Sequence, residues 1–242
     1  FRPEGETDLS FALAELLAGA AGKRPPDLDV KGINADSRAI APGEVFFALP
    51  GTQVHGNGFA GEAVLRGAVA VVSDRAPDED PGVPVVVVDD VRAVYARAAA
   101  RQFAPQPETV VAVTGTNGKS SIVSYVRQLW TACGIEAASL GTVGVETSSG
   151  LMRRELTTSD ALALHRDLGA LKAMGVDHVA LEASSQGLDQ RRVDGLRFRA
   201  VGFTNLTQDH LEYHGGIDGY RDAKLRLFRE LLADEGAAVI NS

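Results

Sequence analysis

The residues best suited to chemistry form one run, Gly-Thr-Asn-Gly-Lys-Ser-Ser at 115–121, between an apolar segment and a helical pattern. Its glycines permit a tight turn whose N–H groups can converge on phosphate oxygens, and the helix start adds positive charge. Lys119 is expected to reach the β- and γ-phosphates, and Ser120 to ligate Mg²⁺. The predicted ATP-binding set is Gly115, Thr116, Asn117, Gly118, Lys119, Ser120 and Ser121.

The spacing of this run departs from the usual phosphate loop, because Val113 stands where the first glycine is normally found. The alternative is an ordinary glycine turn that begins a helix. Strand, glycines, Gly-Lys-Ser and helix all coincide, which favours a nucleoside triphosphate site but leaves the reaction open.

The second half of the chain must position this loop, and its pattern alternates strands with helices. Fully apolar strands between helices are typical of a mostly parallel sheet covered on both faces. We predict strands at 109–114, 178–183, 200–205 and 237–240, and helices at 119–133, from 159 or 160 to 174, and at 220–232.

The first half follows the same rhythm and predicts a smaller α/β unit. The expected helices are 8–19, 59–66 and 90–103, and the expected strands are 33–36, 45–49, 68–72 and 85–88. Two prolines and no apolar periodicity mark residues 104–108 as a linker. We therefore expect two domains, 1–105 and 106–242.

Composition limits the function. An apolar fraction of 45% and a net charge of -8 describe an ordinary globular protein and argue against a general nucleic-acid binder. No apolar run approaches a membrane span, so no membrane insertion is expected. The single cysteine, Cys133, excludes an intrachain disulfide, fits a reducing cytoplasm, and is expected to be buried.

Several segments resemble the Mur ligase family and its relatives, the folylpolyglutamate synthetases. Thr116-Asn117-Gly118-Lys119 has the family's form of the phosphate loop. Further segments that resemble the family lie, in order, at 36–38, 42–48, 181–188, 203–215 and 220–224. The runs 156–158, 184–188 and 190–193 are most similar to the MurE type.

This resemblance implies an ATP-dependent ligase of cell-wall synthesis. Such an enzyme adds the third amino acid, with meso-diaminopimelate expected over L-lysine, to UDP-N-acetylmuramoyl-L-alanyl-D-glutamate through an acyl phosphate. It also implies an N-terminal UDP-binding domain and a central P-loop ATPase domain. The family's C-terminal Rossmann-like domain, which selects the amino acid, has no counterpart here. We expect the 242-residue chain to bind its substrates but to ligate slowly or not at all.

The resemblance also implies two magnesium ions. Ser120 and Glu182 are expected to hold the first, and His210 and a carbamylated Lys224 the second, so that Lys119, His210 and Lys224 are the catalytic residues. Without the resemblance, Lys224 would be interpreted as a solvated helix lysine. His210 and His214 could alternatively form a zinc pair, although Gly215-Gly216 argues against a sustained helix there.

The substrate contacts follow from the same resemblance. Leu156 replaces an Asn often found before the Thr pair, which puts a side-chain contact from that position in doubt. The predicted substrate-binding residues are Ala35, Ser37, Thr52, Gln53, Val54, Thr157, Thr158, Ser184, Gln190 and Arg192. Three other functions remain open: a folylpolyglutamate synthetase, a P-loop kinase or GTPase, and a non-catalytic nucleotide-binding module.

Overall fold

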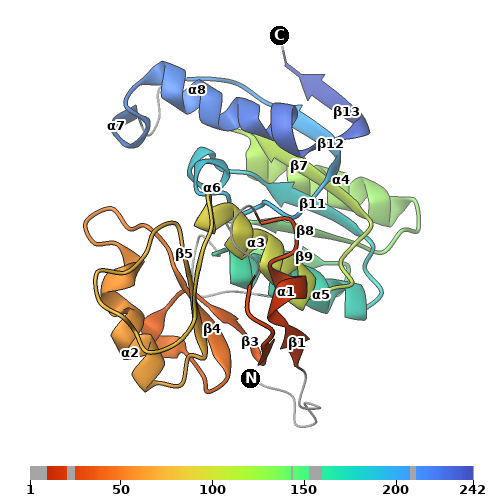
Figure 1. Cartoon of the computed structure of the whole chain (residues 1–242). Coiled ribbons are helices and arrows are strands. Elements are labelled where there is room, and N and C mark those ends of the chain that lie inside the picture. The colour runs from red at the N-terminus through yellow and green to blue at the C-terminus, as the bar shows by residue number, and fades with distance from the viewer. Residues whose placement is uncertain (1–9, 21–24, 143, 153–159, 208–210, 242) are drawn as a thin grey trace. The chain divides into compact units, whose positions relative to one another are not determined.

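The computed structural model describes residues 10–20, 25–142, 144–152, 160–207 and 211–241. The chain divides into two compact units, Phe1–Gln102 and Phe103–Ser242 (Figure 1). Both combine parallel strands with helices, so the predicted α/β class is confirmed. Among the described residues, no helix has the length and apolar character that crossing a membrane requires.

The first unit contains a parallel sheet of order β3-β4-β5-β6, and a short antiparallel pair, β1 and β2. Phe46, Val71 and Ala63 lie in its core, and Phe47 packs on Tyr95. The elements are β1 Phe11–Ala12, α1 Leu13–Leu16, β2 Asp29–Val30, β3 Gly32–Asn34, a 3-10 turn Ser37–Ala39, β4 Glu44–Ala48, a 3-10 turn Gly56–Phe59, α2 Ala60–Leu65, β5 Ala70–Ser73, β6 Val85–Val87 and α3 Val91–Gln102.

The predicted helix 8–19 is wrong in length, since only α1 is helical within its described part. Phe11 and Ala12 pair with β2 instead, and the Leu13 N–H donates to the Leu28 carbonyl at 2.9 Å. Arg101 donates to the carbonyl oxygens of Leu16 and Ala18, at 2.8 and 2.7 Å, where α1 has ended. Partners distant in sequence thus override the local periodicity.

The second unit contains a seven-stranded sheet of order β10-β9-β8-β11-β7-β12-β13. The five strands β8, β11, β7, β12 and β13 run parallel to one another. Strands β9 and β10 form an antiparallel hairpin at the edge beside β8. Its elements are β7 Thr109–Thr114, α4 Lys119–Ala132, β8 Ala137–Gly141, β9 Gly144–Thr147, β10 Gly150–Met152, α5 Ala161–Ala173, β11 His178–Glu182, α6 Ser185–Asp189, β12 Phe198–Phe203, α7 Leu211–His214, α8 Ile217–Arg226, a π-helix Leu227–Leu231 and β13 Leu232–Ile240.

Apolar side chains cover both faces of this sheet. On one face Leu140 and Leu181 pack with Leu168 from α5 and Leu227 from the π-helix. On the other, Val113 and Ala180 pack against α4. Parallel strands that are apolar on both sides are the reason for the continuous hydrophobic runs in the sequence.

Two predictions need correction in this unit, and one hairpin was missed. The helix expected at 220–232 begins at Ile217, becomes a π-helix after Arg226 and ends where β13 starts, at Leu232. The hairpin β9–β10 was not predicted, because its strands are short and carry glycines. Cys133 is exposed, since it lies just beyond the end of α4.

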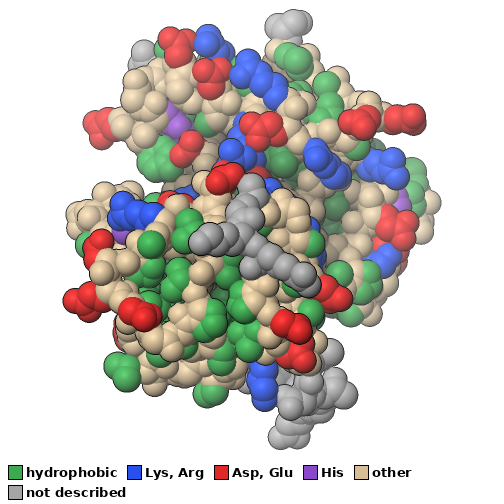
Figure 2. Space-filling model, viewed as in Figure 1, with side chains coloured by type: hydrophobic (Ala, Val, Ile, Leu, Met, Phe, Trp, Pro, Cys, Tyr) green, Lys and Arg blue, Asp and Glu red, His purple; other side chains and the backbone are tan. Residues whose placement is uncertain are grey.

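The surface carries no single-signed face in the view of Figure 2, where acidic and basic side chains are interspersed. The net charge of -8 is thus not offset there by a basic stripe of the kind that nucleic-acid binding needs.

A buried histidine ties the predicted linker to the second unit. His165 is fully buried, and its Nε2 lies 3.1 Å from the Asp194 carbonyl oxygen. With the proton on Nε2, Nδ1 accepts from Gln106 Nε2 at 3.0 Å. Burial lowers the pKa of His165 from 6.5 to about 4, because the charged imidazolium loses its hydration.

This burial predicts a dependence of stability on pH. The folded His165 stays neutral down to a pKa of about 4, whereas the unfolded chain takes up a proton near pH 6.5. Its contribution is therefore complete above pH 6.5 and declines as the pH falls towards 4, by about 3 kcal/mol in all. Urea unfolding from pH 7 to 4.5 should show a shallower decline in His165→Gln than in the wild type. Equal declines would contradict the assignment.

Candidate functional site

The phosphate loop turns tightly between β7 and α4. Gly115 and Gly118 have φ angles of 138° and 86°, which side-chain-bearing residues rarely adopt. A Cβ atom on Gly115 would lie 1.9 Å from Thr204 Oγ1. The first glycine is therefore required both for its backbone conformation and for close contact with the neighbouring segment.

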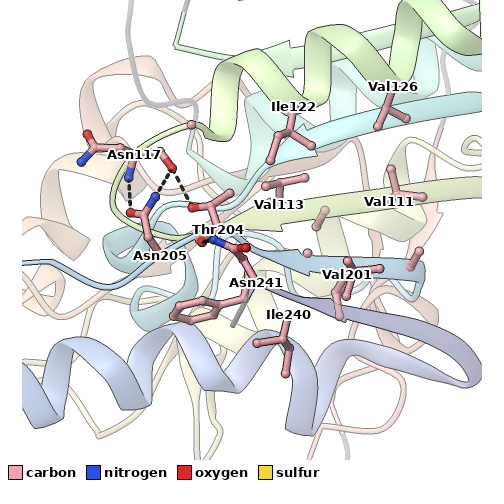
Figure 3. Close-up of a pocket in the computed structure, with 16 residues that line it drawn as sticks. Val111, Val113, Asn117, Ile122, Val126, Val201, Thr204, Asn205, Ile240 and Asn241 are labelled. Atoms are coloured by element: carbon pink, nitrogen blue, oxygen red, sulfur yellow. Dashed lines mark hydrogen bonds between the residues drawn. The ribbon is translucent and has the colours of Figure 1, made fainter.

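Residues 204–207, which follow β12, hold this loop in place. The N–H groups of Thr116 and Asn117 donate to the carbonyl and side-chain oxygens of Asn205, at 2.9 and 3.0 Å. Thr204 Oγ1 donates to the Asn117 carbonyl at 2.6 Å, and Thr207 N donates to Thr116 Oγ1 at 2.9 Å. Figure 3 shows the bonds of Asn117 with Thr204 and Asn205.

These bonds restrict which donors can meet a phosphate. The Thr116 and Asn117 N–H groups already have acceptors within the protein. The first N–H groups of α4, which begins at Lys119, have no partner inside the helix and lie at its positive end. The helix start, more than the preceding turn, is thus suited to bind an anion.

Lys119 and the two serines lie at this helix start. Lys119 is partly buried, and its Nζ donates to the carbonyl oxygens of Gly115 and Thr116, at 3.1 and 2.8 Å. It is therefore folded back over the loop, and these bonds must break before it can reach a phosphate. Ser120 and Ser121 are exposed.

Glu182 ends β11, the strand beside β7, and pairs in register with Val113. Its Oε1 accepts from the Thr142 N–H at 3.2 Å. A Cβ on Gly141 would lie 1.9 Å from the same oxygen, so the carboxylate occupies the space that this glycine leaves open. A carboxylate and a hydroxyl such as that of Ser120 are hard oxygen groups of the kind that Mg²⁺ prefers.

Lys224 reaches the loop from α8. Its side chain is 1% exposed, and its Nζ donates to the Gly115 carbonyl at 2.8 Å. The alternative of a solvated helix lysine is therefore wrong. The same Nζ lies 4.2 Å from the centre of the Tyr220 ring, a cation–π contact.

The histidines are only partly described. His210 lies outside the described residues, as do Thr157 and Thr158. His214 ends α7, after which Gly215 and Gly216 have φ angles of 68° and 125°. The predicted interruption of the helix after His214 is confirmed.

The described substrate residues predicted for the second unit, Ser184, Gln190 and Arg192, form hydrogen bonds within the protein. Ser184 Oγ caps α6 by accepting from the Gly187 N–H at 3.0 Å. Gln190 Oε1 accepts from Arg192 Nη2 at 2.6 Å, while its Nε2 donates to the Tyr213 hydroxyl at 3.0 Å. A substrate would exchange these bonds for its own.

The predicted nucleotide contacts of the first unit follow the carboxyl ends of β3 and β4, where parallel sheets place ligands. Ala35 is partly exposed, whereas Ser37 is buried and its Oγ donates to Glu62 Oε2 at 2.7 Å. The expected turn at Thr52, Gln53 and Val54 is exposed, and the Gly51 N–H donates to the Val54 carbonyl at 3.2 Å.

Arg38 lies beside these contacts and pairs with Asp36. The guanidinium binds the carboxylate at 2.8 Å, and its hydrogen bonds hold the pKa of Asp36 below the usual value. Since Arg38 is already engaged in this pair, the structure favours a structural role over a diphosphate contact.

An apolar cavity of about 780 Å³ adjoins the loop. Val111, Val113, Ile122, Val126 and Ile240 line it, and Asn117, Thr204, Asn205 and Asn241 lie at its polar end (Figure 3). Neither Lys119 nor Lys224 is among its lining residues, so the cavity and the group of charged site residues are separate features.

Sequence reasoning missed four residues that shape this site: Gly141, Thr204, Asn205 and Tyr220. Each acts through a contact with a residue distant in the chain, such as the bond between Thr204 and Asn117. Asn205 offered one signal, since a polar residue directly after an apolar strand often lies at a ligand site. Thr204 and Tyr220 lie in the segments 203–215 and 220–224 that resemble the family, but their contacts carried no signal in the chain alone, and neither did Gly141.

Family comparisons match both units. The model described as "Mur ligase middle domain" matches residues 113–242, and the one described as "Mur ligase family, catalytic domain" matches residues 29–108.

Two similar relatives are named UDP-N-acetylmuramoyl-L-alanyl-D-glutamate--2,6-diaminopimelate ligase. The protein from Bradyrhizobium diazoefficiens is 47% identical over 232 residues, which is 95% of this chain and 48% of that protein. The protein from Mesorhizobium japonicum is 49% identical over 220 residues, 90% of this chain and 46% of that protein. The chain thus spans about half the length of the curated relatives it matches.

A solved structure of a protein with this name is also similar. It is 32% identical, has a TM-score of 0.82, and matches 96% of this chain and 47% of that one. MurF from Acinetobacter baumannii, at 22% identity and a TM-score of 0.63, shows a likeness of fold alone.

The place of Gly141 yields a prediction. In Gly141→Ala the new methyl group must displace the Glu182 carboxylate, a movement that a flexible side chain makes at little cost in stability. Disturbing the support of a metal ligand typically costs 10- to 100-fold in affinity, so Mg²⁺-dependent binding of an ATP analogue should weaken about tenfold. Calorimetry on the 242-residue chain measures this. Gly61→Ala, where a Cβ meets nothing within 4 Å, is the control. Unchanged affinity in Gly141→Ala would dismiss Glu182 as a metal ligand.

Proposed function

Since the chain belongs to the Mur ligase family, we propose that it is part of a cytoplasmic ATP-dependent ligase. This ligase joins meso-diaminopimelate to UDP-N-acetylmuramoyl-L-alanyl-D-glutamate. The observation that supports the proposal best is the convergence of Lys224 on the loop that carries Lys119: both amines donate to the Gly115 carbonyl, at 2.8 and 3.1 Å. The names of the similar relatives favour this reaction over the folate, kinase and non-catalytic alternatives.

The first step activates the substrate carboxylate. A carboxylate oxygen attacks the γ-phosphorus of ATP, the bond from that phosphorus to the bridging oxygen breaks, and ADP leaves with the electron pair. Because two anionic groups approach each other, the step needs cations and oriented donors. Lys119 would leave its two carbonyl acceptors and neutralise the β- and γ-phosphates, which the helix start would orient.

The second step forms the amide. The amine of the incoming amino acid attacks the acyl carbon, inorganic phosphate leaves, and the nitrogen loses a proton. Ser120 and Glu182 would hold one Mg²⁺ ion, which when bound offsets the phosphate charge. The residues that place the substrate would be Ala35, Ser37, Thr52, Gln53, Val54, Thr157, Thr158, Ser184, Gln190 and Arg192.

Lys224 would act as a carbamate together with His210 at a second Mg²⁺. Its neutral amine attacks the carbon of CO2, a nitrogen–carbon bond forms, and one proton passes to the buffer. One carbon–oxygen π bond of CO2 breaks in this step, and the product carries a single negative charge that its two oxygens share. The place of this side chain supports the proposal, because its Nζ lies buried beside the phosphate loop, 2.8 Å from the Gly115 carbonyl, where a carbamate would face the phosphate site.

Because the chain covers about half of its relatives, we propose that the amino acid is selected by sequence that they contain and this chain does not. Closure of such a part would complete the site. The 242-residue chain should therefore bind ATP or the UDP precursor but release phosphate slowly or not at all.

A coupled assay tests the reaction. A longer protein that contains this chain and spans the length of the relatives is given ATP and the UDP-dipeptide. It should release phosphate with meso-diaminopimelate and not with L-lysine. Lys119→Ala should lower that rate at least 100-fold, as expected when a main source of charge stabilisation is lost, with the fold intact by circular dichroism. Phosphate release that needs no amino acid, or an undiminished rate in the variant, would contradict the proposal.

The carbamate makes a separate prediction. Lys224→Ala in the longer protein should lose most of its ligase rate, and formate or acetate should restore part of it by placing a carboxylate in the vacated space. Lys172→Ala is the control, since Lys172 binds Glu108 and Asp177 away from the loop. A wild-type rate in Lys224→Ala without any added acid would dismiss the modified lysine.

A further inference from the structure

We propose that Tyr220 is a positioning residue, which fixes Lys224 with its ring and the phosphate loop with its hydroxyl. This inference rests on the proposed function, because it gives Lys224 the role of a carbamate. Tyr220 and Lys224 are one helical turn apart on α8, so their side chains extend from the same face. Both are 1% exposed.

The ring determines where the lysine nitrogen lies. Lys224 Nζ is 4.2 Å from the ring centre and donates to the Gly115 carbonyl at 2.8 Å. A carbamate nitrogen keeps one N–H, which can still donate to that carbonyl. The new carboxylate must then point away from Gly115. The cation–π attraction belongs to the ammonium form, so the ring acts on the carbamate by packing against it. Tyr220 thereby orients the oxygens that would bind the metal.

The hydroxyl connects the same residue to the loop. Tyr220 Oη lies 3.2 Å from Thr116 Oγ1, which also accepts from the Thr207 N–H at 2.9 Å. Thr116 Oγ1 has one proton, which the Thr207 carbonyl can accept at 3.2 Å. All three bonds are satisfied when Tyr220 is the donor and Thr116 accepts twice. The tyrosine therefore supports the turn that precedes Lys119.

Aromatic contacts also hold the ring. The His214 ring centre lies 5.4 Å from that of Tyr220 and 4.7 Å from that of Tyr213. The Tyr213 hydroxyl donates to Asp189 Oδ2 at 2.9 Å and accepts from Gln190 Nε2 at 3.0 Å. Tyr220 is thus connected to the phosphate loop through its hydroxyl, and through the His214 and Tyr213 rings to Gln190, one of the predicted substrate residues.

The hydroxyl is tested by binding of adenylyl imidodiphosphate with Mg²⁺ to the 242-residue chain. Tyr220→Phe should weaken binding about fivefold, the effect of one net hydrogen bond. Thr116→Val should weaken it by a similar or larger factor, and adding Tyr220→Phe to Thr116→Val should cause no further loss. A purely structural tyrosine would instead give additive losses. Tyr125→Phe, at a residue 62% exposed on α4, is the control and should bind like the wild type.

The ring is tested by the carbamate itself. With ¹³C-labelled bicarbonate, the wild-type chain should give a carbamate carbon resonance that is absent from Lys224→Ala. Tyr220→Phe, which keeps the ring, should retain that resonance, and Tyr220→Leu should lose at least half of its intensity. Thermal melting of each variant separates these effects from a loss of fold.

The outcomes distinguish the inference from the proposed function. If the wild type neither binds the analogue nor gives the resonance, the proposed function fails and the inference fails with it. If the wild type does both and the folded Tyr220 variants match it, only the positioning role is overturned. Additive losses with Thr116→Val would likewise overturn the role of the hydroxyl.

Discussion

The phosphate loop is held by hydrogen bonds to a segment 87 to 91 residues further along the chain. Asn205 accepts from two consecutive loop N–H groups, and Thr204 donates to the Asn117 carbonyl. Gly115 is the residue that makes this possible, because any Cβ there would overlap Thr204. The loop therefore owes its shape to the end of β12 as much as to its own sequence, and the positions of both amines depend on it.

The sheet explains why these segments meet. Gly141, Glu182, Thr114 and Phe203 lie at or near the carboxyl ends of neighbouring strands in the order β8-β11-β7-β12. Parallel strands bring such ends to one edge, and loops that leave this edge can share a ligand. A carboxylate, a helix start and a lysine from α8 are thereby placed around one turn without being near each other in sequence.

Burial of Lys224 is the least ordinary feature of this arrangement. An ammonium group removed from water is destabilising unless it has partners. Here it has the Gly115 carbonyl and the Tyr220 ring. A carbamate at this position would convert that cost into a means of holding a metal, while keeping the bond to Gly115. This account explains why a lysine is suited to a position where its charge alone is unfavourable.

The sequence predicted the elements with strong periodicity, such as α4, whose expected end at 133 lies within one residue of the observed one. It also singled out the loop from its glycines, Lys119 and the helix that follows, and Glu182 and Lys224 from their resemblance to a known family. It did not predict the hairpin β9–β10, whose strands are short and carry glycines. It also gave α1 the wrong length, because the pairing and capping that end this helix come from distant residues. The Tyr220 and Gly141 contacts were inaccessible for the same reason: they arise only when the strands have assembled.

The most direct test of the central claim is a crystal structure of this chain with Mg²⁺ and adenylyl imidodiphosphate. The account predicts the β- and γ-phosphates at the N-terminus of α4, with Lys119 turned from the Gly115 and Thr116 carbonyls towards them, and with the Asn205 bonds to the loop intact. Phosphates bound elsewhere, with Lys119 still on those carbonyls, would contradict it.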